Sequence, residues 1–353
     1  MQNYALQTLL ERRGHTVTTL NFPVVEVYPR NKIHHFLSNC RRFIHKLFGY
    51  PDVIWVDIFK EYRKRVELAT LQKNFLDKKL NLYSIKAPLS WQQIKDFNFD
   101  AYLVGSDQVW RPRYNRENLT NLFLDFVEGK DVKRVSYAAS FGTDKWEMSN
   151  EETERCSHLA KLFDAISVRE SSGIELCKSY LGVDAIHVID PTLMLDAEDY
   201  LSLCGGFEHP KGDYIAVYSL DYTKEKLALL NTVSKRLNIP LHFIGSFSKS
   251  GYPSMESWLE GIAYAKYVIT DSFHGVAFSI VFKKQFVTLG NPIRGNGRFD
   301  SLFATLGIPM ERQTNEVNKI LSLFQQLINY DDVNSFKERN RIISNNFLDK
   351  AGL

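Results

Sequence analysis

The sequence predicts an α/β protein made of two Rossmann-like, doubly wound domains, and three observations support this fold class. The chain has 353 residues, more than one hydrophobic core usually holds, so two domains of roughly 150 to 200 residues each are expected. Short apolar runs alternate with helical patterns, which is typical of parallel strands covered by helices on both faces. Most runs end in small or polar residues, so we expect a ligand cleft at the strand ends.

The chain opens with an expected helix that ends near Gly14, followed by a strand over residues 16–20. Apolar residues recur at helical spacing in this helix: Ala5, Leu6, Leu9 and Leu10. A parallel α/β domain normally places a strand and a glycine turn ahead of such a helix, and we find neither. Two expectations stay open, a natural start at Met1 and a start that lies within the domain.

Residues 33–48 predict a basic amphipathic helix, with apolar side chains along one stripe and His, Arg and Lys largely opposite. Such a helix can lie on an anionic membrane, with its cations on lipid phosphates. The alternative is a helix packed on its own domain with a solvated basic face. We assign it to a basic helical insertion at about residues 30–90, which also contains a helical stretch from about Asp57 to Asp77.

Four further strands are expected in the N-terminal domain, which we place at residues 1–205. They are residues 99–104, 133–142, 164–170 and 185–192. A glycine- and proline-containing stretch at 204–213 marks the expected domain boundary.

A second alternating set predicts the C-terminal domain, residues 206–330. Its expected strands are residues 213–220, 241–246, 267–272 and 285–290, and its expected helices are residues 223–237, 254–265 and 274–282, with others near Ser301 and Val317. The last helix, at about 336–348 within a separate segment 331–353, could cross back to the first domain.

Composition excludes several classes of protein. Hydrophobic residues at 44% and charged residues at 24% describe a globular chain, and a net charge of +3 is too mild for a nucleic-acid partner. The four cysteines are scattered and no histidine pair has metal-ligand spacing, so we expect no metal and no other cofactor. The absence of a leader pattern and of an apolar run of about 18 residues predicts a cytoplasmic protein, with peripheral contact at the inner membrane face as an option through residues 33–48.

The strongest local signal is YVITDSFHG, a buried strand that leads directly into a helix. Free backbone N–H groups in the first turn of a helix favour an anion, and Gly275 would let a ligand approach closely. His274 stands beside this anion site with Ser272. A lone histidine is more often structural, but the end of a parallel strand is where α/β proteins place functional groups.

Two arginines follow in a glycine-rich loop, Arg294 and Arg298, where guanidinium groups could bind phosphate or carboxylate oxygens in bidentate fashion. The alternative is a pair of solvated loop side chains.

In the first domain, polar residues follow three expected strands. GSDQVW offers Asp107 and Gln108, with Trp110 as a platform for a sugar ring; SVRE offers Arg169 and Glu170; IDPT offers Asp190 and Thr192. Asp107 could instead be a helix cap. The recurrence of polar residues at the ends of successive strands predicts one shared cleft.

Taken in order, GSDQVW, SYAASFG, SVRE followed by SG, IDPT and VITDSFHG followed by the Arg298 loop resemble the polysaccharide pyruvyl transferase family, over about residues 3–306. The resemblance implies two domains similar to GT-B glycosyltransferases, with phosphoenolpyruvate held mainly by the C-terminal domain and a saccharide acceptor by the N-terminal one. It also implies a pyruvate ketal as product, and the catalytic histidine of the family falls on His274.

Two features depart from the family pattern. Some members carry an arginine where this chain has Ser272, which gives more weight to Arg169, Arg294 and Arg298 as donor-binding residues. The family's N-terminal strand and glycine turn, which would precede Asn3, are also absent.

These observations give a mechanistic hypothesis. His274 would protonate the vinyl carbon of phosphoenolpyruvate as general acid, and Asp107, or second Glu170, would accept the proton of the attacking hydroxyl. Gln108 and Trp110 would contact the acceptor, which could be lipid-linked. Two alternatives stay open: a GT-B glycosyltransferase that uses a nucleotide sugar, and an inactive scaffold in polysaccharide assembly. The oligomeric state is not predicted.

Overall fold

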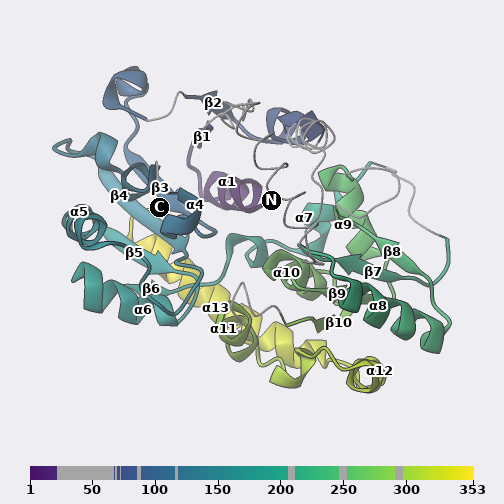
Figure 1. Ribbon diagram of the computed structural model, residues 1–353. Helices are drawn as coiled ribbons and strands as arrows, with labels where there is room; N and C mark the ends of the chain where they lie inside the picture. The colour runs from purple at the N-terminus through teal and green to yellow at the C-terminus, as the bar shows by residue number, and fades with distance from the viewer. Residues whose placement is uncertain are drawn as a thin grey trace, which may run out of the picture.

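The computed structural model describes residues 1–21, 67, 70–71, 73–85, 89–115, 118–205, 211–245, 253–290 and 297–353. These residues form a mixed α/β fold in which the strand pairs of every sheet are parallel. The N-terminal and C-terminal halves each contribute a four-stranded sheet, and the two lie side by side (Figure 1). The predicted α/β class with parallel strands is therefore confirmed.

The N-terminal half places its four main strands in sequence order, β3-β4-β5-β6. They are β3 (Ala101–Gly105), β4 (Lys133–Ala139), β5 (Ala165–Val168) and β6 (Ile186–His187). A separate pair consists of β1 (Thr19–Asn21) and β2 (Leu82–Ser84). Each strand lies within or next to a predicted one, except β2, which falls in the expected insertion.

Helices cover both faces of this sheet. On one face, α1 (Gln2–Arg12) contributes Leu6 and Leu9 to a core shared with Val135 and Tyr137 of β4. On the other, α5 (Asn150–Ala160) contributes Leu159 to a second core. Helix α5 begins at a capping box, in which the Ser149 side chain accepts from the Glu152 backbone N–H and the Glu152 side chain accepts from the Ser149 N–H.

The C-terminal sheet has the order β10-β9-β7-β8. Its strands are β7 (Ile215–Tyr218), β8 (Leu241–Phe243), β9 (Tyr267–Thr270) and β10 (Gln285–Thr288). The chain goes from β7 to β8 on one side and then returns across β7 to build β9 and β10 on the other. Open α/β sheets bind ligands at such a reversal of strand order, next to the carboxyl ends of the strands.

Alternating strand residues explain why helices cover both faces of this sheet. Ile215 and Val217 of β7 pack with α8 (Lys224–Leu237) and α12 (Val317–Gln325). Ala216, between them, belongs to the core formed with α9 (Met255–Ala263) and α10 (Phe273–Val281).

The remaining elements are short, apart from α11. They are α4 (Pro112–Asn115), α6 (Ser172–Leu176), α7 (Ala197–Leu201), α11 (Gly297–Leu306), and the helical turns η1 (Trp91–Gln93), η2 (Lys95–Phe97), η4 (Thr120–Phe123), η5 (Asp125–Val127), η6 (Cys177–Leu181), η7 (Pro191–Leu193) and η8 (Met310–Arg312).

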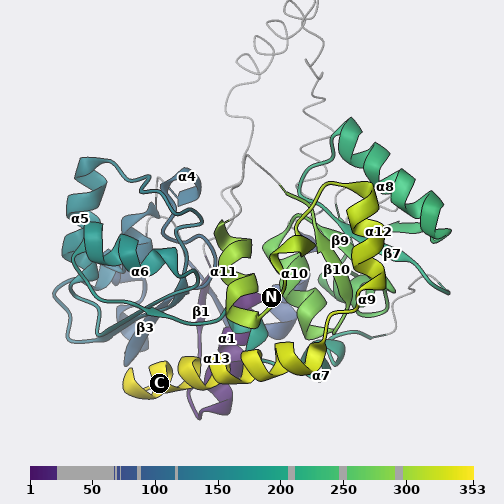
Figure 2. The ribbon, with the colours of Figure 1, turned by 90° about the horizontal axis from the view of Figure 1, so that it is seen from below.

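The last helix, α13 (Tyr330–Lys350), runs beneath both halves (Figures 1 and 2). Its Ser344 hydroxyl accepts from the Ile189 N–H at 3.2 Å, and Phe347 packs against Tyr137 of β4. Near its start, Val333 joins the core that contains α10 and α11. The two halves thus share one hydrophobic core, and the domain boundaries at 205 and 330 stay predictions.

Several predicted segments lie outside the described residues: the basic helix 33–48 with Cys40, most of the stretch from Asp57 to Asp77, the centre of the boundary 204–213, and Arg294. Among the helices that are described, none is long and apolar enough to cross a membrane.

Candidate functional site

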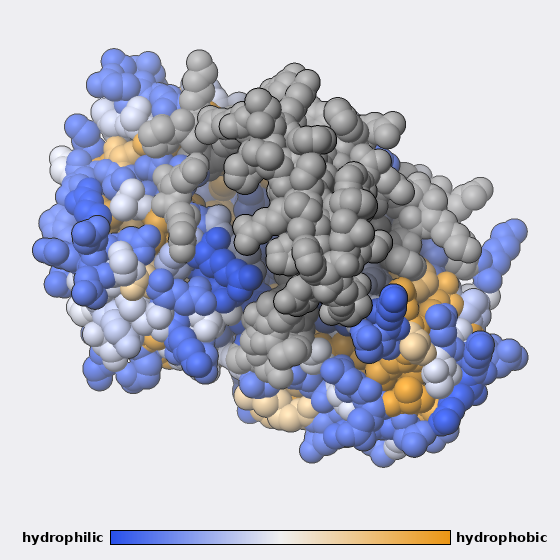
Figure 3. Space-filling view, viewed as in Figure 1, coloured by the Kyte–Doolittle hydropathy of each residue, from blue (hydrophilic) through white to orange (hydrophobic). Residues whose placement is uncertain are grey.

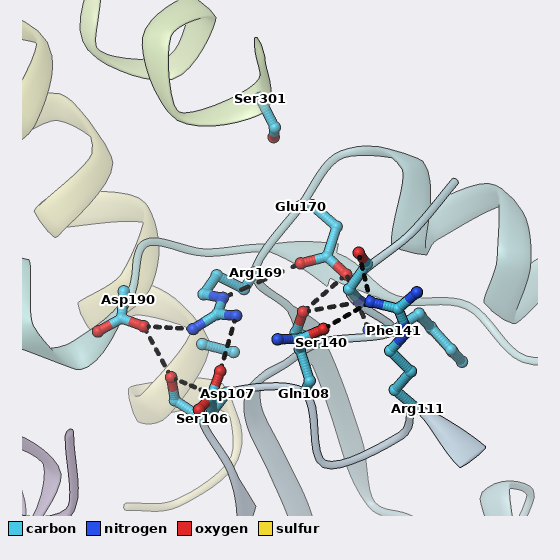
Figure 4. Close-up of polar contacts among 12 residues, drawn as sticks. Ser106, Asp107, Gln108, Arg111, Ser140, Phe141, Arg169, Glu170, Asp190 and Ser301 are labelled. Atoms are coloured by element: carbon cyan, nitrogen blue, oxygen red, sulfur yellow. Dashed lines mark hydrogen bonds and ion pairs between the residues drawn. The ribbon is translucent and has the colours of Figure 1, made fainter. Parts of the chain in front are cut away.

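Four charged or titratable side chains from different elements meet between the two sheets. Asp107 follows β3, Arg169 follows β5 and Asp190 follows β6, while His274 is the second residue of α10, directly after β9. Parallel strands end at the same edge of a sheet, which is why residues so far apart in sequence converge. Figure 4 shows Arg169 between the carboxylates of Asp107 and Asp190.

Arg169 and Asp190 form a buried ion pair at the centre of the cluster. Arg169 NH1 lies 3.0 Å from Asp190 Oδ2, with side chains 1% and 0% exposed. The guanidinium carbon also lies 4.4 Å from the centre of the Phe273 ring, a cation–π contact. Burial opposes the charge of Arg169, but Asp107 and Asp190 outweigh it and raise its pKa. Arg169 therefore stays charged.

His274 is a partly exposed member of the cluster, with 24% of its side chain accessible. Its Nε2 lies 3.9 Å from Asp190 Oδ2. The orientation of the Gln2 amide that satisfies its neighbours brings Oε1 to 3.0 Å from His274 Nε2 and 3.2 Å from Arg169 NH1. Burial lowers the pKa of His274, although the charges of Asp190 and Asp107 oppose the shift. The imidazole is therefore neutral at neutral pH.

Both carboxylates of the cluster are ionised. Burial alone would raise the pKa of Asp190, but the charge of His274, which is protonated in the acidic range where Asp190 titrates, the charge of Arg169 and hydrogen bonds from Thr192 outweigh it and lower the pKa to about 2. The same balance, with Arg169 as the main opposing charge, lowers the pKa of Asp107. Asp107 is 52% exposed and 3.2 Å from Arg169 NH2, so it is a weak base that faces solvent.

A glycine shapes the loop that carries Asp107. Gly105 has φ +134°, and a Cβ there would lie 1.9 Å from the Tyr137 carbonyl oxygen. Any other residue would have to push β4 away. The next residue, Ser106, donates from its hydroxyl to Asp190 Oδ2 at 2.8 Å and so joins the loop to the cluster.

Glu170 is near the cluster, but its carboxylate is engaged in hydrogen bonds with other residues of the protein. Its carboxylate accepts from the Ser140 hydroxyl at 3.0 Å, the Phe141 N–H at 2.8 Å and the Gly142 N–H at 3.1 Å, with 3% of the side chain exposed (Figure 4). The other oxygen, Oε2, is buried without a hydrogen-bond partner. These contacts place Glu170 as the anchor of the loop after β4.

The structure corrects the prediction for Trp110. Its side chain is 0% exposed, stacks on Phe123 with ring centres 4.7 Å apart, and donates from Nε1 to the Leu122 carbonyl at 2.9 Å. The large apolar indole is buried in the hydrophobic core, so it offers no platform for a sugar ring. Gln108, two residues earlier, is half-buried and accepts from Arg111 NH1 at 2.9 Å.

Helix α10 begins where it was predicted, and its Gly275 has a role in packing that was not predicted. Ser272 precedes the helix, is buried, and makes no side-chain cap. A Cβ on Gly275 would lie 2.1 Å from Thr270 Oγ1. The glycine is therefore needed for close packing of α10 on β9, and its role in ligand approach stays a prediction.

Arg298, the second residue of α11, is an under-satisfied cation beside the cluster. Its Nε is buried without a hydrogen-bond partner. Burial and the charge of Arg169 lower its pKa, against the opposing charges of Glu170 and Asp107. A buried polar atom without a partner is costly, so an anion bound here would be favoured. Ser301 of the same helix accepts from the Ser171 N–H at 3.0 Å, which ties α11 to the loop after Glu170.

Two residues of the cluster, Gln2 and Ser106, were not predicted, and Asp190 was predicted at the shared cleft without a specific role. Asp190 caps η7 by accepting from the Thr192 N–H at 3.0 Å. Its second oxygen reaches Arg169 and Ser106, which the sequence does not signal. Gln2 lies on α1, whose sequence shows only the helical spacing of apolar core residues and gives no sign of a functional side chain.

The side chains of the cluster do not form a recognisable set of metal ligands. Across the described parts of the chain, no three His, Cys, Asp or Glu side chains gather as metal ligands.

Fold and site define an α/β protein with a charged cluster at the carboxyl ends of its parallel strands, the place where enzymes of this class bind small ligands. A family model described as polysaccharide pyruvyl transferase matches residues 1–292. The chain belongs to this family of transferases. No curated protein sequence matches the chain.

Proposed function

We propose that the protein transfers pyruvate from phosphoenolpyruvate to two hydroxyls of a saccharide, forming a pyruvate ketal and releasing phosphate. The observation that carries this proposal is the placement of His274, partly exposed at the start of α10 and within the Asp107–Arg169–Asp190 cluster. A proton donor and a carboxylate close to one another are what addition of a hydroxyl across the double bond of an enol phosphate requires.

The proposed reaction has two stages. His274 protonates C3 of phosphoenolpyruvate, and a saccharide hydroxyl adds to C2 while Asp107 accepts its proton. A second hydroxyl then attacks C2 and gives its proton to the deprotonated His274, while the bond from C2 to the phosphate oxygen breaks and phosphate leaves with the proton that Asp107 had accepted. Asp107 is better placed than Glu170 as the base because it is 52% exposed, whereas Glu170 is enclosed by the loop after β4.

The bound donor would also supply the charge that His274 needs. Burial lowers the pKa of His274 in the free protein. The phosphate and carboxylate of phosphoenolpyruvate are negative, and nearby negative charge raises the pKa of an imidazole. Donor binding would therefore protonate the proposed general acid.

Donor binding is proposed at the α10 start and at the arginines around it. Free backbone N–H groups in the first turn of a helix favour an anion, and Ser272 precedes that turn. Arg298 adds a buried Nε with no hydrogen-bond partner. Arg169 binds carboxylates through NH1 and NH2, but its Nε is also buried without a hydrogen-bond partner. Arg294 stays a predicted donor-binding residue.

The acceptor is proposed to lie against the N-terminal sheet, near Gln108, in a GT-B-like arrangement of two Rossmann-like domains. We further propose that the protein acts in the cytoplasm without a cofactor. A lipid-linked acceptor would give residues 33–48 a role in membrane contact.

The decisive experiment incubates the protein with phosphoenolpyruvate and a panel of galactose, glucose and mannosamine acceptors, and measures phosphate release and a pyruvate-sized gain in acceptor mass. His274→Gln, which keeps a polar side chain but no general acid, is the matched control and should lose both signals. Release of a nucleoside diphosphate from a nucleotide sugar would support a glycosyltransferase instead. Stabilisation by phosphoenolpyruvate argues against an inactive scaffold.

A further inference from the structure

Gln2, the first residue of α1, places its side-chain amide within hydrogen-bond distance of the imidazole of His274. The same amide atom lies 3.2 Å from Arg169 NH1 and 3.2 Å from the backbone N–H of Asp107. Both are donors in every protonation state, so the oxygen of Gln2 faces them rather than its NH₂ group. Asp190 Oδ2 lies 3.5 Å from this atom, at the limit of a hydrogen bond, and weighs less than the two donors. The oxygen that faces the cluster is then 3.0 Å from His274 Nε2.

This contact decides which nitrogen of His274 carries the proton. An amide oxygen only accepts, so Nε2 must donate to it, and the neutral imidazole then has its lone pair on Nδ1. Asp190 does not take this role, because its Oδ2 lies 3.9 Å from Nε2, beyond hydrogen-bond distance. Asp190 therefore acts on the ring through its charge, whereas Gln2 selects the tautomer.

The other ring nitrogen, Nδ1, is the one left for a ligand. Every polar contact of the imidazole with the described residues is made through Nε2, and 24% of the side chain is accessible. We propose that Gln2 is a positioning residue that holds His274 as the Nε2–H tautomer and leaves Nδ1 to exchange a proton with a bound ligand.

In the pyruvyl transfer proposed above, on which this step rests, the transferred proton is the one on Nδ1. Donor binding adds a proton to Nδ1, and Nδ1 gives it to C3 of phosphoenolpyruvate. The second hydroxyl then returns a proton to Nδ1. Throughout, the Nε2 proton of His274 stays on the hydrogen bond to Gln2.

The packing of α1 makes Gln2 suitable for this role. Leu6, one turn further along, belongs to the core shared with β4. Arg169 NH1 lies 3.2 Å from the oxygen of Gln2 and donates to Asp190 Oδ2 at 3.0 Å, so one guanidinium holds both the amide and the carboxylate. A supporting side chain that is itself held by hydrogen bonds keeps the group it contacts in one orientation.

Nitrogen-15 NMR of the imidazole, recorded on the chain without phosphoenolpyruvate, tests the proposal. The His274 signals are assigned by their loss in His274→Gln. At about pH 8, where a histidine is neutral, we expect a protonated Nε2 that exchanges slowly with solvent and an unprotonated Nδ1. Gln2→Met keeps the length of the side chain without the amide oxygen and should lose the slowly exchanging Nε2 proton. Gln2→Glu keeps an oxygen at this place and should retain it.

The same variants give a kinetic readout. Gln2→Met should lower kcat by about tenfold and change the KM for phosphoenolpyruvate by less than about twofold, because the amide orients the imidazole and does not hold the donor. An unchanged kcat would remove Gln2 from the proton transfer.

Gln7→Met is the matched control, because Gln7 lies about one and a half turns further along the same helix. Gln7 accepts from the Asn81 N–H at 3.2 Å and lines a cavity of about 1000 Å³ in the N-terminal half, where the space-filling view shows a hollow (Figure 3). The control therefore disturbs α1 to a similar extent and should leave the nitrogen signals of His274 unchanged.

Three results would overturn the proposal. They are a proton on Nδ1 in the native protein, the same spectrum for the native protein and Gln2→Met, and a change in Gln7→Met as large as that in Gln2→Met. The spectrum does not depend on pyruvyl transfer. The expected tautomer without any transfer activity would count against the proposed function alone, and transfer activity with the wrong tautomer would count against the role of Gln2 alone.

Discussion

The substitution Asp190→Asn tests how much the buried ion pair of the cluster contributes to the stability of the fold. Asp190 is 0% exposed, and its two oxygens have different partners. One accepts from the Thr192 N–H and hydroxyl at 3.0 and 2.7 Å; the other accepts from Ser106 at 2.8 Å and Arg169 at 3.0 Å. An amide can accept on one side only, so Asn would turn an NH₂ group toward donors.

The expected loss is large because the remaining charge is buried. Removing one partner of a buried ion pair typically costs about 3 to 5 kcal/mol. Independently, the pKa of Asp190 falls from 3.8 to about 2, and such a shift corresponds to about 2 kcal/mol of stability at neutral pH. Since the folded pKa is lowered, that stability is present above about pH 4 and is lost as the pH falls toward 2.

Urea unfolding of the two proteins at pH 7 and at pH 3 measures both effects. Asp199→Asn is the matched control, because Asp199 pairs with Arg12 at the surface, where side-chain exposures are 18% and 54%; it should lose less than about 1 kcal/mol. The native protein should lose stability between the two pH values more steeply than the Asp190 variant. A loss at pH 7 no larger than that of the control would refute the argument.

Three further predictions concern the site. His274→Ala should lower kcat by about 100-fold or more with an unchanged unfolding midpoint. The kcat/KM of the native protein should rise as the pH falls below about 6.5, because the lowered pKa of His274 leaves little imidazolium at neutral pH. A flat pH profile of kcat/KM would contradict the role of His274 as general acid. Arg298→Ala should raise KM for phosphoenolpyruvate about tenfold with a smaller change in kcat, measured by phosphate release, whereas an unchanged KM removes it from the donor site. Trp110→Ala should cost about 3 to 5 kcal/mol in urea unfolding yet leave acceptor KM unchanged in the folded protein; a selective rise in that KM would restore the platform role.

The fold class followed from the sequence because apolar runs of strand length alternate with helical patterns. That signal is local, and β3, β4, β5, β7, β9 and β10 each lie within or next to a predicted strand. The order of strands is not local. The return of the chain across β7 depends on how whole strand–helix units pack, which no window of sequence contains.

For the site, the sequence placed Asp107, Arg169 and His274 at strand ends, and the structure brings them together. The prediction for Trp110 was wrong because a position after a strand does not show in which direction the side chain points. The stacking on Phe123 and the hydrogen bond to the Leu122 carbonyl set the orientation of its indole. Glycine has the same ambiguity, since the sequence did not show that Gly275 is needed for the close packing of α10 on Thr270.

By itself, the sequence determined the local structure: which segments form strands, where each strand ends, and the histidine that follows β9. Only the tertiary structure decided the electrostatics. Asp190 has a pKa of about 2, and His274 is neutral, because burial and neighbouring charges act through space over a few ångströms. A cavity lined by residues 16–20 and 101–106 has the same origin, since these segments are about 80 residues apart and only packing brings them to one place.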